Sequence, residues 1–233
     1  MIILGGTFDP PHLGHLVAAE CARHQFGEDR VVFLPAGDPY RKSRDEGRDV
    51  TPAAMRLEMV RLAIAGNSAF HIDDREMRRD GPTYTVDTLR ELAEEGVHRP
   101  VMIFGADAVE DMARWREPEA ITELARIAVA PKAGTTLEAL PAGGTWLDMP
   151  LLDISSTLIR ERVAQGAPIR YLVPEAVERL HPGAGAVPVG SSRTRFRTSS
   201  RWRDTMCCWP SRAVAGCATL AVALGTHGWR VLM

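Results

Sequence analysis

Short runs rich in β-branched residues alternate with helix-like segments through most of this 233-residue chain. The alternation predicts a parallel sheet with right-handed crossovers, because each helix returns the chain to the start of the next strand. We therefore expect an α/β fold: a Rossmann-like, doubly wound, mostly parallel sheet with helices on both faces. The expected strands are 2–4, 31–34, 70–72, 101–104, 127–130 and 146–149, and the expected helices are 15–26, 53–65, 85–95, 120–124, 155–165 and 174–180.

Two of these helices have marked starts. Thr51-Pro52 supplies an N-cap followed by a proline in the first helical position. Thr85, which precedes Val-Asp-Thr-Leu, is expected to cap the helix at 85–95 in the same way.

The C-terminal end differs from the rest of the chain in charge and in hydrophobic pattern. Residues 184–233 hold seven arginines and one acid, Asp204, so they carry +6 within a chain of net charge −2, and the remainder carries −8. The segment has no sustained hydrophobic period and few apolar residues that could offset the cost of ordering it. We expect a folded domain at 1–183 and an atypical, disordered tail at 184–233.

Composition also disfavours several function classes. The acidic main body argues against a nucleic-acid partner. The N-terminus lacks a secretory pattern, and the apolar stretch 213–224 is shorter than the roughly 20 residues of a membrane span. The four cysteines lack zinc-site spacing, so neither a protein-bound metal nor a disulfide is expected. The expectation is a cytoplasmic protein without a membrane partner, with a homo-oligomer left open.

The most informative motif, residues 5–16, follows the first expected strand and reads Gly-Gly-Thr-Phe-Asp-Pro-Pro-His-Leu-Gly-His-Leu. A glycine pair lets the backbone approach a ligand, and the helix that follows offers unpaired N–H groups and a positive dipole end. Glycines alone are more often a simple turn. His12 and His15, however, stand where a positive charge is unfavourable unless an anion joins them, so the motif predicts a phosphate site.

A second motif lies far downstream, at residues 154–160, and reads Ile-Ser-Ser-Thr-Leu-Ile-Arg. Its hydroxyl residues are suited to cap a helix, and Arg160, one turn later, is suited to clamp a phosphate. Alone, the pattern favours an ordinary capped surface helix. Paired with the first motif, it predicts a second phosphate-binding element.

The two motifs together resemble the phosphate-binding elements of the nucleotidylyltransferase superfamily. Residues 81–89, Gly-Pro-Thr-Tyr-Thr-Val-Asp-Thr-Leu, and residues 105–107, Gly-Ala-Asp, followed by Trp115, resemble its nicotinate-nucleotide adenylyltransferases in particular. The resemblance covers roughly residues 1–182.

The chain departs from that family pattern in three places. Arg116 stands where many relatives have an aromatic residue, and Lys132-Ala133-Gly134 replaces an arginine-proline-glycine element. The family's usual ending in leucine-tyrosine has no counterpart after Leu180. The second departure puts a phosphate contact by Lys132 in doubt.

The resemblance implies adenylyl transfer from ATP to nicotinate mononucleotide, giving deamido-NAD and pyrophosphate in NAD biosynthesis. His12 and His15 would be catalytic, and Mg²⁺ would be bound mainly through the ATP phosphates. The other residues it assigns are Gly5, Gly6, Thr7, Phe8, Gly105, Asp107, Ser155, Ser156, Thr157 and Arg160 for ATP, and Lys42, Thr85, Trp115 and Arg116 for the mononucleotide. Asp107 would bind ribose hydroxyls, and Trp115 would stack on the pyridine ring.

Two alternatives stay open at this point. A related enzyme of the superfamily would use nicotinamide mononucleotide or pantetheine phosphate instead. A non-catalytic nucleotide-binding sensor would use the altered tail as its output, although such a module has little need of both phosphate motifs.

Overall fold

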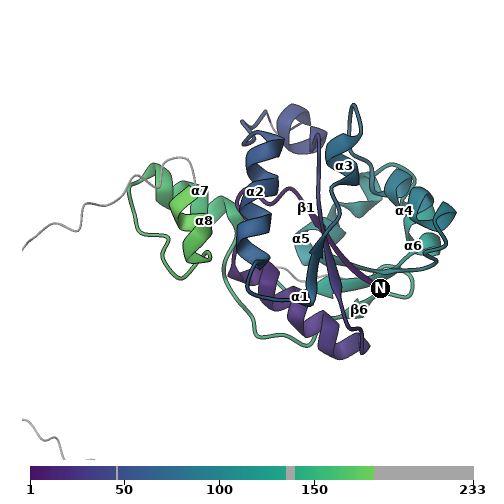
Figure 1. The fold of residues 1–233 in the computed structure, drawn as a ribbon. Helices are drawn as coiled ribbons and strands as arrows, with labels where there is room; N and C mark the ends of the chain where they lie inside the picture. The colour runs from purple at the N-terminus through teal and green to yellow at the C-terminus, as the bar shows by residue number, and fades with distance from the viewer. Residues whose placement is uncertain (46, 135–139, 181–233) are drawn as a thin grey trace, which may run out of the picture. The chain divides into compact units, whose positions relative to one another are not determined.

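The computed structural model describes residues 1–45, 47–134 and 140–180 (Figure 1). Within them lies a six-stranded sheet of order β3-β2-β1-β4-β5-β6, in which every neighbouring pair of strands is parallel. The strands are β1 (Ile2–Gly6), β2 (Val31–Pro35), β3 (Phe70–Ile72), β4 (Val101–Gly105), β5 (Arg126–Ala130) and β6 (Thr145–Trp146). The predicted α/β class is confirmed. The expected boundary at 183 and the tail 184–233 lie outside the described residues.

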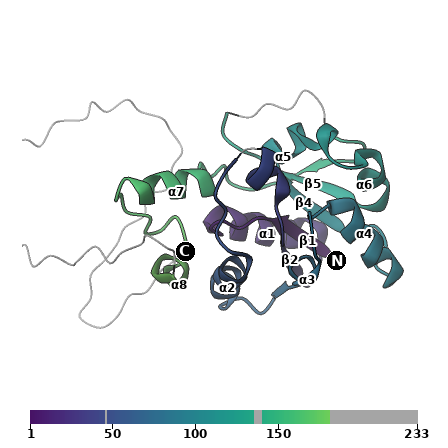
Figure 2. The same ribbon diagram turned by 90° about the horizontal axis from the view of Figure 1, so that it is seen from above.

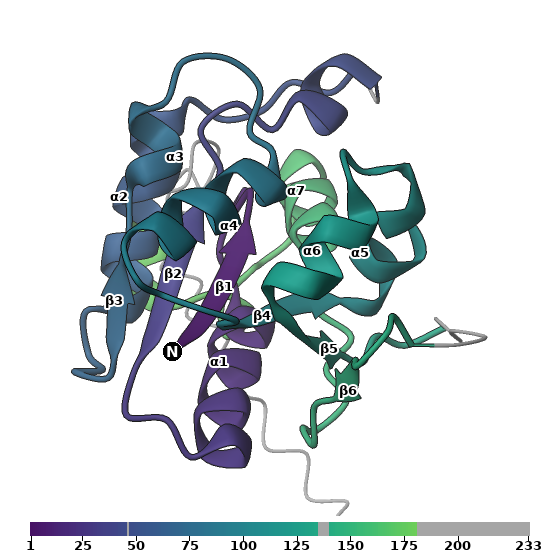
Figure 3. The same cartoon turned by 90° about the vertical axis from the view of Figure 1, so that its right-hand side faces the viewer.

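Helices cover both faces of this sheet. The helices are α1 (Leu13–Phe26), α2 (Ala53–Ile64), α3 (Arg75–Arg78), α4 (Thr85–Glu94), α5 (Ala106–Glu110), α6 (Pro118–Leu124), α7 (Ser156–Ala164) and α8 (Glu175–Leu180), with a π-helical turn η1 (Arg41–Asp45) and a 3₁₀ turn η2 (Met112–Arg114). Seen from above, α1 and α2 lie on one side of the strands and α4 and α6 on the other (Figure 2). In Figure 3 the face with α4 and α6 is turned toward the viewer.

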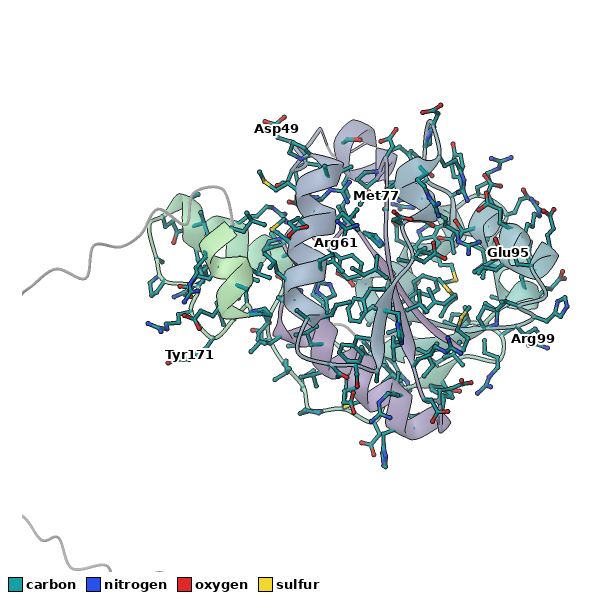
Figure 4. All side chains as sticks on the ribbon, in the orientation of Figure 1. Asp49, Arg61, Met77, Glu95, Arg99 and Tyr171 are labelled. Atoms are coloured by element: carbon teal, nitrogen blue, oxygen red, sulfur yellow. The ribbon has the colours of Figure 1, made fainter. Side chains whose placement is uncertain are left out.

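The period of two along each strand explains this two-sided core. On β1, Ile2 and Leu4 pack into the cluster that includes α1 and α2, whereas Ile3 packs with α4, α5 and α6. Strands buried on both faces have few polar positions, which is why they read as apolar runs in the sequence. Exposed charges such as Glu95 and Arg99 lie on the periphery (Figure 4).

A third, smaller cluster joins the last two helices to α2. Met59 of α2 packs with Ile159 of α7, Val177 of α8, and two residues of the connection between them, Ile169 and Val173. These five side chains are buried, so α7 and the motif at its start are held against the sheet domain. Among the described residues, no helix combines the length and the apolarity that crossing a membrane requires.

Several local expectations need correction. Helix α2 begins at Ala53 with Pro52 as its N-cap, so Thr51 does not cap it; the Thr51 carbonyl instead accepts a hydrogen bond from Arg56. Thr85 is the first residue of α4, and Tyr84 takes the cap position. Strand β6 is shorter than the predicted 146–149 and starts one residue earlier.

The order of the strands determines where a ligand can bind. The chain leaves β1 for β2 on one side and later returns to β4 on the other, so the order reverses between β1 and β4. In such sheets a crevice opens at the carboxyl ends of the strands beside the reversal. Gly5 and Gly6 end β1, and Gly105 ends β4, so the predicted glycines stand at this crevice.

Candidate active site

The loop after β1 brings polar groups into a buried position. Thr7, Asp9 and His12 are each less than a tenth exposed. Phe8 takes a left-handed backbone with φ of 51°, and its buried ring meets the His15 ring edge-on, with centroids 5.0 Å apart. A non-glycine residue in this conformation costs of order 1–3 kcal/mol and persists where surrounding contacts fix it.

The two histidines of the first motif form one unit at the start of α1. His12 is the N-cap, and its backbone N–H donates to His15 Nδ1 at 3.1 Å. The two rings are stacked with centroids 3.7 Å apart. Because His15 Nδ1 accepts a hydrogen bond, the neutral ring carries its proton on Nε2 and has that N–H to donate.

Burial keeps both rings neutral in the free protein. It lowers the pKa of His12 to about 4 and, together with the nearby charges of His12 and Lys42, lowers that of His15 well below its ordinary value. The pair therefore avoids placing positive charge against the helix N-terminus. His12 Nδ1 is buried beside the backbone at the start of α1, where the His12 and His15 side chains form a capping box.

The second motif lies directly against the first. Ser155 caps α7 by accepting from the Leu158 N–H at 3.1 Å. Ser156 donates its hydroxyl to the Pro10 carbonyl at 2.9 Å, and Arg160 donates to the Asp9 carbonyl at 2.7 Å and to Thr157 Oγ1 at 3.1 Å. Two segments about 150 residues apart thus form one wall.

Two cavities open at the carboxyl edge of the sheet. The aromatic cavity, of about 230 Å³, has four aromatic residues in its lining: Tyr40, Tyr84, Phe104 and Trp115. The polar cavity, of about 270 Å³, is lined by both phosphate motifs and the end of β4. They share the wall formed by Gly5, Gly6, Thr7, Lys42, Phe104 and Ala108.

Every residue expected in the site lines one of these cavities. The polar cavity has Gly5, Gly6, Thr7, Phe8, His12, His15, Lys42, Gly105, Asp107, Ser155, Ser156, Thr157 and Arg160. The aromatic cavity has Gly5, Gly6, Thr7, Lys42, Thr85, Trp115 and Arg116. Four of these residues, Gly5, Gly6, Thr7 and Lys42, line both cavities, whereas the others line one.

Aromatic side chains from four segments meet in the aromatic cavity. Trp115 is half-buried rather than fully exposed as its arginine neighbours suggest, and its ring packs edge-on against Phe104 with centroids 5.2 Å apart. Tyr84 packs against Tyr40, with centroids 5.0 Å apart, and lies under the Arg116 guanidinium at 4.8 Å. These flat surfaces suit a planar ring.

One predicted residue has a partner that the sequence did not suggest. Asp107 accepts a hydrogen bond from Lys132 at 2.7 Å and another from the Ala108 N–H at 3.0 Å. Burial alone would raise the pKa of Asp107, but these bonds and the lysine charge outweigh it, so the pKa is lowered. Lys132 therefore contacts the carboxylate that was expected to bind ribose.

Sequence reasoning missed some residues of the site. Arg48 lines the polar cavity and forms an ion pair with Asp9 at 3.5 Å. Glu76 lines the aromatic cavity and is 5% exposed, accepting a hydrogen bond from the Thr88 hydroxyl at 2.7 Å. Neither stands in a recognisable motif, and only the fold brings them to the cavities.

Comparisons with known proteins identify the family of this chain. The family model described as Cytidylyltransferase-like matches residues 3–162. A protein of Roseiflexus sp. (strain RS-1), named probable nicotinate-nucleotide adenylyltransferase, is 45% identical over 75% of this chain and 91% of its own length. The chain belongs to the nicotinate-nucleotide adenylyltransferase family. A relative of the same name from Desulfitobacterium hafniense (strain Y51) is 46% identical over 75% of this chain and 89% of its own.

Solved structures share the fold of this adenylyltransferase family member. The nicotinic acid mononucleotide adenylyltransferase of Plasmodium falciparum, complexed with NaAD, has a TM-score of 0.65 at 17% identity, covering 77% of this chain and 92% of that one. A putative nicotinate-nucleotide adenylyltransferase from Vibrio parahaemolyticus has a TM-score of 0.55 at 20% identity, covering 77% and 89%.

Proposed function

We propose that this protein transfers the adenylyl group of ATP to nicotinate mononucleotide, giving deamido-NAD and pyrophosphate, a step of NAD biosynthesis. The observation that carries the proposal is the shared wall of the two cavities at Gly5–Thr7 and Lys42. A reaction that joins two nucleotides through their phosphates needs adjoining sites of this kind. The relatives of the chain bear the name of this activity.

In this mechanism a phosphate oxygen of the mononucleotide attacks the α-phosphorus of ATP. A new P–O bond forms to the adenylyl group, and the bond to the β-phosphate breaks, releasing pyrophosphate with its electron pair. No covalent enzyme intermediate is needed, so the protein contributes positioning and charge stabilisation. His12, His15 and Arg160 would donate hydrogen bonds to the phosphates as negative charge develops there.

The aromatic cavity would hold the pyridine ring and read its carboxylate. Thr85 stands at the N-terminus of α4, where backbone N–H groups and the helix dipole favour an anion. Convergent N–H donors form hydrogen bonds with both oxygens of a carboxylate, whereas the NH₂ of an amide is itself a donor and cannot accept from them. This difference gives selectivity for the acid. Trp115 would stack on the ring, and Arg116 would close the side beside Tyr84.

The polar cavity would hold ATP. The N-terminus of α7, with Ser155, Ser156 and Thr157, would face its phosphates, while Gly105 gives the ligand room at the end of β4. Asp107 would bind the ribose hydroxyls, exchanging its contact with Lys132 for them.

Mg²⁺ would enter with ATP, held mainly by the phosphate oxygens. Within residues 1–45, 47–134 and 140–180, no group of three or more His, Cys, Asp or Glu side chains could hold a metal ion. The ion supplies charge neutralisation of the phosphates when it is bound.

A cytoplasmic location and a homo-oligomeric assembly belong to the proposal as well.

A substrate panel tests the proposed function. Pyrophosphate release is measured with ATP and, in turn, nicotinate mononucleotide, nicotinamide mononucleotide and pantetheine phosphate. We expect release with the first and much slower release with the other two. Equal or faster turnover of the amide would refute the proposed selectivity, and absence of release with all three would refute the function.

Trp115→Ala should raise KM for nicotinate mononucleotide about tenfold, as expected for loss of an aromatic stacking partner. The KM for ATP should stay nearly unchanged, because Trp115 lines only the aromatic cavity. Steady-state kinetics with each substrate varied checks this. Trp146→Ala is the matched control, since Trp146 is 40% exposed and lines neither cavity.

The thermal stability of Trp115→Ala separates a binding role from a packing role. A half-buried side chain should cost less than the roughly 3–5 kcal/mol lost when a core aromatic is truncated. A loss of that full size, with unchanged KM values, would make Trp115 a core residue.

Residues 184–233 are proposed to be dispensable for catalysis. Limited proteolysis should trim the chain near Gly183 to a stable core that keeps its activity. The proposal rests on the charge and composition of the segment. It also rests on the length of the relatives, because a match to 75% of this chain already covers about nine-tenths of each relative. A protected segment, or a trimmed protein that no longer turns over, would contradict it.

A further inference from the structure

One buried cation lies behind the shared wall without lining either cavity. Arg56, on α2, is 1% exposed and has the largest volume of the fully buried residues in the described part of the chain. It lines neither cavity. Burying a guanidinium is costly unless its N–H groups are all engaged. No carboxylate of the described part of the chain forms an ion pair with it.

Backbone carbonyls accept the hydrogen bonds of the guanidinium, and the charges of Asp9 and Asp38 favour its cationic form from beyond ion-pair distance. Arg56 Nη1 donates to the carbonyls of Thr7 at 2.8 Å and Ala36 at 2.7 Å, and Nη2 donates to Gly37 at 2.8 Å. Nε donates to Thr51 at 2.9 Å. One rigid, planar group thus joins the loop after β1, the turn after β2 and the start of α2.

The bonded carbonyls belong to walls of the site. Thr7 is part of the wall shared by both cavities, and Ala36 lines the aromatic cavity. Gly37 also lies close to α3, because a Cβ there would collide with the carbonyl of Glu76. The turn at 36–37 therefore contacts both Arg56 and α3.

That turn also supports the segment before α4. The Asp38 N–H donates to Thr83 Oγ1 at 3.1 Å, and the Thr83 N–H donates to the Asp38 carbonyl at 3.0 Å. Thr85, proposed to receive the pyridine carboxylate, follows two residues later. Hydrogen bonds and short stretches of backbone thus connect Arg56 with Thr7 on one side and with the segment before Thr85 on the other.

We propose that Arg56 is a positioning residue for adenylyl transfer. By holding the Thr7 carbonyl and the 36–37 turn in one frame, it sets the alignment of the mononucleotide phosphate with the α-phosphorus of ATP. This inference rests on the proposed function. Misalignment by about 1 Å can slow a reaction by roughly a hundredfold without abolishing binding.

The test compares Arg56→Lys and Arg56→Ala with Ile64→Ala. Lysine keeps the positive charge but lacks the planar set of donors, so it separates charge from geometry. Ile64 is two turns further along α2, is buried in the core cluster shared with α1 rather than the one that holds α7, and lines neither cavity. It therefore controls for loss of stability in the same helix.

For each variant, kcat and both KM values are measured well below its melting temperature, and the affinity for each substrate alone is measured by calorimetry. We expect kcat to fall about a hundredfold in Arg56→Ala and at least tenfold in Arg56→Lys, with each affinity within about threefold of wild type. Ile64→Ala should lose stability and keep its kcat.

Three results would overturn the inference: wild-type kcat in Arg56→Lys, an equal loss of kcat in Ile64→Ala, or failure of both Arg56 variants to fold. If Arg56→Ala alone fails to fold, the lysine variant decides. Wild-type protein in the same assay keeps the two claims apart, because an inactive wild type refutes the proposed function itself.

Discussion

His15→Ala is expected to lower kcat about a hundredfold, with a smaller change in KM for either substrate. The magnitude is that of losing one donor to a developing oxyanion. Negative charge on the pyrophosphate leaving group grows toward the transition state, so a donor aimed at it helps there more than in the bound ground state. In the free protein His15 is neutral and has its Nε2–H available, because Nδ1 accepts from the His12 N–H.

Steady-state kinetics on His15→Ala and His24→Ala check this expectation. His24 is exposed on the same helix, which makes it the matched control for loss of an imidazole from α1. A loss confined to KM would indicate that His15 binds the ground state and the transition state equally.

Glu76→Gln is expected to stabilise the protein at alkaline pH. Burial raises the pKa of Glu76 to about 7, against the opposing effects of the Thr88 hydrogen bond and the Arg79 charge. The folded state therefore favours the protonated carboxyl. Its contribution to stability is fully present below about pH 4.5 and is lost as pH rises through about 7.

Glutamine imitates the protonated form and can still accept from Thr88. The free energy of unfolding of Glu76→Gln should therefore exceed that of wild type by a margin that grows by about 2–3 kcal/mol between roughly pH 5 and pH 8. Denaturant unfolding at several pH values measures this margin. Glu94→Gln, an exposed change on α4, should show no such growth. A margin that is constant with pH would show that Glu76 is ionised throughout.

The fold was predictable because its strands are buried on both faces. Val31–Pro35 and Val101–Gly105 are short apolar runs, and such runs alternate along the chain with helices, which is the pattern of a parallel sheet. The turns η1 and η2 and helices α3 and α5 were not predicted, because three to five residues are too few to establish a period. Contacts with the rest of the fold define them.

The site was predictable where local sequence carries the chemistry. Glycines, histidines and a capped helix start are visible in a sequence as phosphate-binding features, and all of them line the polar cavity. The carbonyl partners of Arg56 and the burial of Glu76 were not predictable, because both arise from segments that only the fold brings together. The same holds for the ion pair between Asp107 and Lys132.

The most direct test of the central claim follows the α-phosphorus of ATP. Purified protein is incubated with ATP labelled at the α-phosphate and nicotinate mononucleotide, and the products are separated. The account predicts that the label appears in a dinucleotide with the mass of deamido-NAD, in equal amount to the pyrophosphate released. Label found in free AMP or ADP, with no labelled dinucleotide, would contradict it.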